Sequence, residues 1–235
     1  MCVRFFTHKA LPLQSLQRLL FLGARRCYCR RSLCTFSSPA GARSGRCRRS
    51  LYRVQQNDEV FGDETIIVVA AAGLHAACVS DKGTVWTWGI GDHGTLGHGN
   101  REPKRRPTKL GREMYGDAPA LMISCTLVLT VTGLVWSCGL GEHGRLGHGN
   151  TADKWILTLI ETGDILGTDI IFIAAGGLHS MALEATGTVR TWGFGESGQL
   201  GHNNLEDRLM PTAVTREAFN MHKVVSVAAG RVHSV

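Results

Sequence analysis

The chain has 235 residues, of which 29 are Gly and only three are Tyr, a composition that favours turn-rich structure over long helices. Its net charge of +7 is unevenly divided, because residues 1–57 carry 12 Lys or Arg and no acidic residue, whereas residues 58–235 carry 14 basic and 19 acidic residues. No segment reaches the ~18 to 20 consecutive apolar residues of a transmembrane helix, so we expect no membrane partner, and the sequence divides into a basic leader and a mildly acidic globular part.

The leader, residues 1–57, has the composition of a mitochondrial or plastid transit peptide, rich in Arg and Ser and without acidic residues. Part of it can form an amphipathic import helix, in which Arg18 and Arg25 lie opposite an apolar face. That face holds Leu13, Leu16, Leu20 and Ala24. Two alternatives are a disordered tail and an upstream stretch wrongly joined to the coding frame, and a third is a nucleic-acid-binding tail. A genuine leader predicts a mitochondrial or plastid location; otherwise we expect the cytoplasm or nucleus.

From Ile66 onward, short β-rich runs alternate with Gly, Asp and Asn, which is typical of an all-β protein. The runs that we expect to be strands are residues 66–71, 75–80, 84–88, 127–131, 134–138, 170–175, 181–184 and 188–192. Pro107 and Pro211 lie in register in the segments between copies and indicate outer strands, where proline is tolerated best. Each unit then offers about four strands, enough for one propeller blade. Three cysteines without evident pairing indicate a reducing, intracellular compartment: Cys78, Cys125 and Cys138.

One glycine-rich motif occurs three times, at residues 86–100, 136–150 and 190–204. A period near fifty residues predicts a repeat architecture. Glycines in fixed register indicate positive φ or close backbone approach. The positions that we single out as structural repeat positions, including histidines upstream of the motif, are His75, Trp88, Gly89, Gly94, Leu96, Gly97, Gly139, Gly144, Leu146, Gly147, His179, Trp192, Gly193, Gly198, Leu200, Gly201 and His233.

The segment upstream of the motif also repeats, but imperfectly. Residues 71–75 match residues 175–179 and 229–233, each ending in His, whereas the middle copy has Cys125 at that position. The middle copy also lacks the glycines, so either its turn differs or its strand runs straight through. We expect the three histidines to donate hydrogen bonds to backbone carbonyls within their blades.

Within the motif, alternate residues predict two faces of a strand. Small residues define the inward face: Val85, Val135, Val189, Thr87, Ser137 and Thr191. The other face holds Trp86, Trp136 and Arg190, and a position that accepts both Trp and Arg is expected to be at least partly exposed.

The recurring histidines raise the question of a metal site, since His93 and His98 lie five residues apart and the middle copy repeats the pair. Ser197 replaces the first histidine of the third pair, and no additional ligand recurs, so we expect hydrogen-bonded turn histidines and no metal. A carboxylate just before each turn is expected to bond the turn amides: Asp92, Glu142 and Glu196. The Gly-x-Gly segments lack the following helix of a nucleotide loop, so we expect no cofactor, no catalytic residue and no enzyme activity.

These features together resemble the regulator of chromosome condensation repeat family. The resemblance rests on the segment Gly73-Leu-His75, the strand Val85–Gly89 and the turn Gly94-Thr-Leu-Gly97, with matching elements near residues 139 and 193, and it covers residues 66–235. It implies a seven-bladed β-propeller. Three motifs and the opening of a fourth unit at residues 224–235 predict a partial propeller of three to four four-stranded blades, preceded by the disordered leader.

The family resemblance implies a protein-interaction scaffold rather than an enzyme. One alternative is guanine-nucleotide exchange on a Ran-like small GTPase, and another is that the repeats belong to a larger protein such as a ubiquitin ligase. A small GTPase is thus one candidate protein partner, and we do not expect the repeats to bind nucleic acid. A partial ring also leaves unpaired strand edges, which predicts self-association.

Overall fold

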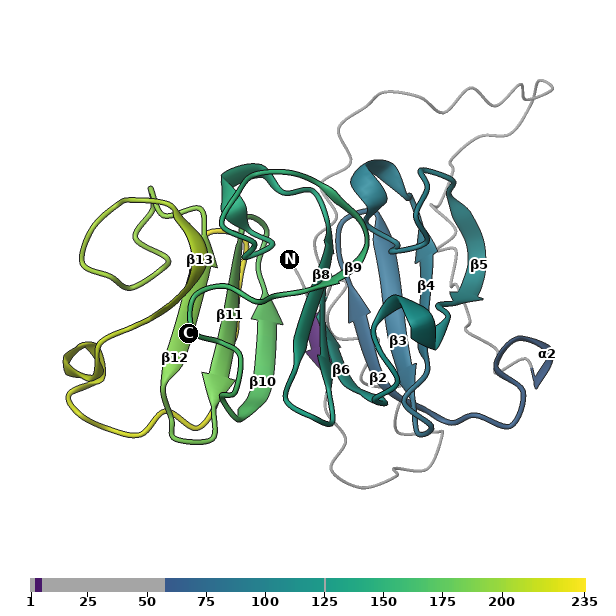
Figure 1. Ribbon diagram of the computed structural model, residues 1–235, viewed down its shortest axis with the longest axis horizontal. Coiled ribbons are helices and arrows are strands. Elements are labelled where there is room, and N and C mark those ends of the chain that lie inside the picture. Colours follow the sequence, from purple (N-terminus) through teal and green to yellow (C-terminus); the bar gives the residue numbers. More distant parts are fainter. Residues whose placement is uncertain (1–2, 6–57, 125) are drawn as a thin grey trace, which may run out of the picture. The chain divides into compact units, whose positions relative to one another are not determined.

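The computed structural model describes residues 3–5, 58–124 and 126–235. The predicted import helix lies outside the described residues. In the described part, three antiparallel sheets follow one another along the chain, coloured from blue to green in Figure 1. Their strands, in the order β2 to β13, are Ile66–Ala71, His75–Ser80, Val85–Gly89, Lys104–Lys109, Ala120–Ser124, Leu127–Thr130, Val135–Gly139, Lys154–Leu159, Ile170–Ala175, His179–Glu184, Val189–Gly193 and Arg208–Ala213.

Each sheet is a simple meander, in which consecutive strands pair as β2-β3-β4-β5, β6-β7-β8-β9 and β10-β11-β12-β13. The all-β fold with four-stranded blades is therefore confirmed. The described helices are short: α2 (Asp58–Phe61) and four single 3-10 turns, η1 (Asp92–Gly94), η2 (Arg112–Met114), η3 (Glu142–Gly144) and η4 (Arg216–Phe219). None of them has the length and apolar character that crossing a bilayer requires.

One strand falls inside the predicted leader. Strand β1 (Val3–Phe5) pairs antiparallel with β2, placing Val3 opposite Ala71, and widens the first sheet to five strands. The backbone groups at the edge of β2 thus accept a further strand. Strand β1 and the three sheets belong to one compact unit, and α2 belongs to a second.

Apolar clusters fill the space between successive sheets. The first joins β2, β3 and β4 to the second sheet through residues such as Val79, Ile123 and Val128. The second joins the second and third sheets and includes Trp192, which is fully buried. The blades therefore stabilise one another by burying apolar surface that no single sheet could cover, as repeat architectures require.

The predicted inward face is buried, including Val85 and Thr87. The opposite face differs at one position, since Trp86 is only 8% exposed, whereas Arg190 is half-buried as expected. Trp86 lies opposite Lys109 on the outer strand, and the Lys109 ammonium lies 5.9 Å from the centroid of the indole ring. The Lys109 ammonium thus lies over the face of the indole ring, and Trp86 is buried where partial exposure was expected.

The glycine turns are seats for the outer strand of the following sheet. A Cβ at Gly94 would lie 2.5 Å from the Cα of Trp155 on β9, and one at Gly144 would lie 2.6 Å from the Cα of Leu209 on β13. Both glycines also have positive φ, +75° and +72°. The backbone of one turn thus packs directly on the next strand, which explains why a side chain is absent there.

A fourth unit begins after η4. Ala229 and Ser234 form an isolated antiparallel bridge in the register of the Ala175–Ser180 pair that ends β10. Val227 is buried in the cluster that covers the outer side of the third sheet. The predicted opening of a fourth repeat therefore has the local geometry of the preceding units.

Candidate functional site

The hydroxyl on the central strand of each blade bonds both its own turn and a histidine. Thr87 Oγ1 donates to the Leu96 carbonyl at 2.8 Å and lies 3.0 Å from His98 Nε2. Ser137 and Thr191 make the same two contacts, with Leu146 and His148 and with Leu200 and His202. Because a hydroxyl has one proton, which the carbonyl accepts, each ring Nε2 must carry a proton and donate.

These three histidines are held neutral. Burial first, and then the positive charge of Lys154, lower the pKa of His148 to about 4. Burial also lowers the pKa values of His98 and His202, each beside its own basic residue. A neutral imidazole that donates through Nε2 holds the turn against the central strand of its blade, so these repeated histidines stabilise the fold.

A second set of histidines links adjacent blades. His93 Nδ1 lies 2.8 Å from Asp153 Oδ2, and His143 Nδ1 lies 2.8 Å from Asp207 Oδ2. The other oxygen of each aspartate accepts a backbone N–H, from Gly141 at 2.9 Å and from Gly195 at 2.8 Å. One carboxylate thus ties the turn of its own blade to the turn of the preceding blade.

This arrangement corrects the prediction for the turn carboxylates. The Gly141 and Gly195 amides are bonded by Asp153 and Asp207, whereas Glu142 pairs with Arg145 at 2.9 Å. The aspartates lie twelve residues beyond the amides, a separation that local turn chemistry does not suggest. Their sequence signal is an Asp followed by a basic residue, 54 residues apart; the first copy has Pro103 at that position. Burial raises the pKa of Asp153, but the Gly141 and His93 hydrogen bonds outweigh it and lower the pKa overall.

Of the upstream histidines, His179 bonds between blades rather than within its own blade. His179 Nε2 lies 3.0 Å from Ser234 Oγ of the fourth unit, and Ser234 Oγ donates to the Gln199 carbonyl at 2.7 Å. The expected bond to a backbone carbonyl is therefore replaced by one to a hydroxyl, because Ser234 itself occupies the carbonyl. His179 is 1% exposed, and burial, with a smaller effect of His233, lowers its pKa to about 4.

The middle blade has a shorter turn between its first two strands. In the first sheet Ala70 pairs with Ala77, and in the third Ala174 pairs with Met181, so six residues separate each pair. In the second sheet Ser124 pairs with Leu127, leaving only two. Of the two alternatives, a different turn is the one observed, and it lacks four residues of the Gly-Leu-His loop.

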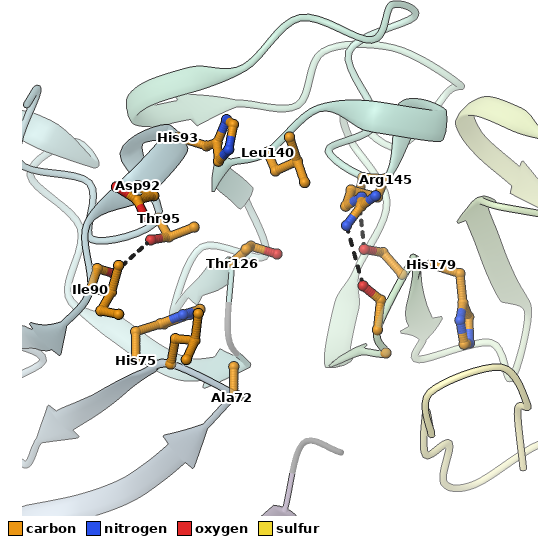
Figure 2. A pocket seen from close by; sticks show the side chains of 15 residues that line it. Ala72, His75, Ile90, Asp92, His93, Thr95, Thr126, Leu140, Arg145 and His179 are labelled. Carbon is orange, nitrogen blue, oxygen red and sulfur yellow. Dashed lines mark hydrogen bonds between the residues drawn. The ribbon is translucent and has the colours of Figure 1, made fainter. Parts of the chain in front are cut away.

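The place of the missing loop is a pocket of about 320 Å³ (Figure 2). Its walls come from the first-blade loop at Leu74 and His75, from the turn after β4, and from the third-blade loop at Gly176 and Gly177. Thr126, Leu140 and Arg145 belong to the middle blade and lie between these walls. In Figure 2, Ile90, Asp92 and Thr95 lie across the pocket from Arg145. The pocket thus combines repeated residues, such as His75 and His179, with residues of the middle blade, which lacks the corresponding loop.

Arg145 is the main charged group on its side of the pocket. Its side chain is 12% exposed and donates to the Glu142 carbonyl and carboxylate, each at 2.9 Å. Nη1 also reaches the Gly177 carbonyl at 3.3 Å, bridging the second and third blades. Burial lowers the pKa of the guanidinium, although the Glu142 carboxylate opposes this effect. The position is Thr95 in the first copy and Gln199 in the third, so the arginine is particular to this blade.

The predicted repeat positions are distributed through the blade interiors and junctions rather than gathered at one site. His75 and His179 line the pocket, whereas Leu96, Leu146 and Leu200 are buried at the turns. His233 lies in the fourth unit and is exposed. The pocket itself was not predicted, although the absence of the Gly-Leu-His loop from the middle copy is the sequence signal for it. No group of three metal-ligating side chains occurs within the described ranges.

Comparison with known proteins identifies the repeats. The model of the regulator of chromosome condensation (RCC1) repeat matches residues 82–126, 132–183 and 186–235. The chain is 32% identical over 164 residues to the human E3 ubiquitin-protein ligase HERC2, and the aligned segment covers 70% of this chain and 2% of that protein. It is 33% identical over 180 residues to the mitochondrial RCC1 domain-containing protein RUG3 of Arabidopsis thaliana, covering 72% of this chain and 39% of that protein.

A solved structure shares the architecture. Prp20p from Saccharomyces cerevisiae superimposes with a TM-score of 0.63 at 21% identity, covering 72% of this chain and 42% of the yeast chain. The chain therefore spans less than half the length of each of these three proteins. At this identity the likeness to Prp20p establishes the fold alone.

Proposed function

Because the chain belongs to the RCC1 repeat family, we propose that it is a non-enzymatic scaffold that presents loops of its blades to a protein partner. Residues 58–235 form the interaction part in this proposal, and residues 1–57 are a basic leader whose strand β1 pairs with β2. The repeated glycines, hydroxyls and histidines support the blades, which leaves the non-repeated loop residues to determine the partner.

The observation that carries the proposal is that the repeated polar groups make hydrogen bonds within their own blades. The hydroxyls of Thr87, Ser137 and Thr191 each bond a carbonyl and an imidazole of their own blade. The thiols of Cys78 and Cys138 are buried, and burial raises the pKa of each to about 12, which keeps them protonated and unreactive at neutral pH. The recurring pairs of hydroxyl and histidine are thereby assigned to stability, and the two cysteines, which do not recur, are buried side chains of the core.

Guanine-nucleotide exchange on a Ran-like small GTPase is the second candidate. The structure of Prp20p is described together with its binding to Gsp1p and histones, which supports a protein partner of this kind. Membership of a larger ligase is the third candidate, and the similarity to HERC2 supports it. In either case the described repeats contribute recognition.

Affinity capture distinguishes these candidates. The full chain, immobilised and exposed to native extract, is expected to retain a protein partner. Recovery of a GTPase whose nucleotide exchange accelerates when the purified chain is added would replace the scaffold proposal with the exchange proposal. Recovery of partners without any effect on nucleotide exchange would support the scaffold.

We further propose that residues 1–57 direct the protein to mitochondria. The Arg-rich, acid-free composition and the similarity to mitochondrial RUG3 support this location. Residues 1–57 fused to a fluorescent protein are expected to co-localise with a mitochondrial marker. A matched fusion with all 12 basic residues changed to Gln should remain diffuse, and a diffuse signal from the native leader would reject the proposal.

A further inference from the structure

The pocket at the shortened turn of the middle blade lies where the other two blades have a longer loop. The first and third blades each fill the corresponding position with their own loop, which includes Leu74 in one and Leu178 in the other. The middle blade retains the surroundings but lacks those four residues. The surroundings are therefore shaped for a short loop that this chain does not itself supply.

Ser180 indicates which hydrogen bond the missing loop would make. The equivalent Ser234 donates to a carbonyl and also receives the His179 imidazole. Ser180 likewise donates, to the Arg145 carbonyl at 2.8 Å, and it is 2% exposed. In the middle copy the histidine position is Cys125, and among the described residues no donor reaches the Ser180 oxygen. A hydroxyl that lines the pocket thus has acceptor capacity to offer to an incoming N–H.

The walls define the rest of the occupant. Leu74, Ile90 and Leu140 supply aliphatic surface, and Leu74 is 68% exposed. Opposite Arg145, the exposed Asp92 carboxylate makes no ion pair or hydrogen bond within the described part of the chain. Because Glu142 already neutralises Arg145, the unbalanced charge at the pocket is negative. The complementary occupant is aliphatic and basic.

We propose that this pocket binds a short segment of a protein partner in which an aliphatic side chain lies next to a lysine or arginine. The aliphatic side chain packs against Leu74 and Leu140, and the cation pairs with Asp92. A backbone N–H of the segment donates to Ser180 Oγ. This inference rests on the proposed scaffold function and names the site and the class of segment that it recognises.

The test uses the full chain, labelled with ¹⁵N, and the peptide N-acetyl-Gly-Leu-Lys-Gly-amide followed by NMR. We expect the peptide to shift the amide resonances of Asp92, Leu140 and Ser180. A peptide with Glu in place of Lys, and one with Gly in place of Leu, should bind more weakly. Asp92→Asn should weaken the Lys peptide about fivefold, the effect of one partly exposed ion pair. Glu196→Gln changes the equivalent exposed carboxylate of the third blade and should leave the affinity unchanged.

A second variant fills the pocket. Replacing residues 125–126 with a copy of residues 175–180 restores the loop length of the other blades and should abolish binding. Equal binding of the Lys and Glu peptides, no effect of Asp92→Asn, or no binding at all would overturn the proposal; if the loop graft fails to fold, Asp92→Asn decides alone. If the native chain does not bind the peptide but still retains protein partners from extract, this site is rejected and the scaffold function stands.

Discussion

Replacing Gly144 with alanine should destabilise the repeats far more than the same replacement at Gly198. The two glycines occupy equivalent turns and have nearly the same φ, +72° and +73°. A Cβ at Gly144 would lie 2.6 Å from the Cα of Leu209, whereas one at Gly198 would meet only the Leu205 Cδ2, at 3.9 Å. The pair of variants therefore separates the cost of a left-handed backbone from the cost of a clash between blades.

The magnitudes follow from these two contributions. A left-handed alanine costs about 1–2 kcal/mol, which applies to both variants. The clash at Gly144 is with backbone, which cannot rotate away, and overpacking of this kind adds about 1–3 kcal/mol. We expect a loss of about 2–5 kcal/mol for Gly144→Ala and about 1–2 kcal/mol for Gly198→Ala.

Urea denaturation followed by tryptophan fluorescence measures the difference, because Trp192 is buried at the junction of the second and third sheets. The native chain is the reference, and equal slopes of the unfolding free energy against urea would show that the same surface unfolds in each variant. Equal destabilisation by the two substitutions would refute the view that the glycine turn is a seat for the next outer strand.

Three further outcomes are expected. Asp207→Ala removes the acceptor of both His143 and the Gly195 amide and should lower the unfolding free energy by about 1–3 kcal/mol. Asp117→Ala, an exposed change outside this link, serves as the control, and equal effects would contradict the inter-blade role. Burial lowers the pKa of His179 from 6.5 to about 4, so between these values the unfolded chain binds more protons than the folded one, and stability should fall as the pH drops through this range. Denaturation at several pH values checks this. His179→Gln should reduce the dependence of stability on pH without abolishing it, because the pKa of His148 is also lowered to about 4, and an unchanged slope would contradict the assignment. Burial raises the pKa values of Cys78 and Cys138 to about 12, so iodoacetamide at pH 8 should leave both cysteines unmodified in the folded protein. Both should be alkylated in guanidinium, as mass spectrometry of the peptides would show. Labelling of either cysteine in the folded chain would contradict this assignment.

Several features were predictable because they depend on local pattern. Alternation of apolar residues and bounding glycines located β2, β3 and β10 at their observed bounds. The proline positions located the outer strands β5 and β13. The outer strand β9 and the first strand β6 of the middle blade were not predicted, because they lack a repeated proline or the Gly-Leu-His segment that marks their counterparts.

What the sequence determined by itself is the repeat: its period, most of its strands and the positions where only glycine fits, since these follow from backbone conformation within one unit. The tertiary structure alone decided which groups meet between units. Asp153 bonds His93 across 60 residues of sequence, the Lys109 ammonium lies over the Trp86 ring, and the turn lacking four residues leaves a pocket bounded by three blades. Such contacts depend on how neighbouring sheets stack, and the spacing of two residues along the chain does not give the distance between their side chains in the fold.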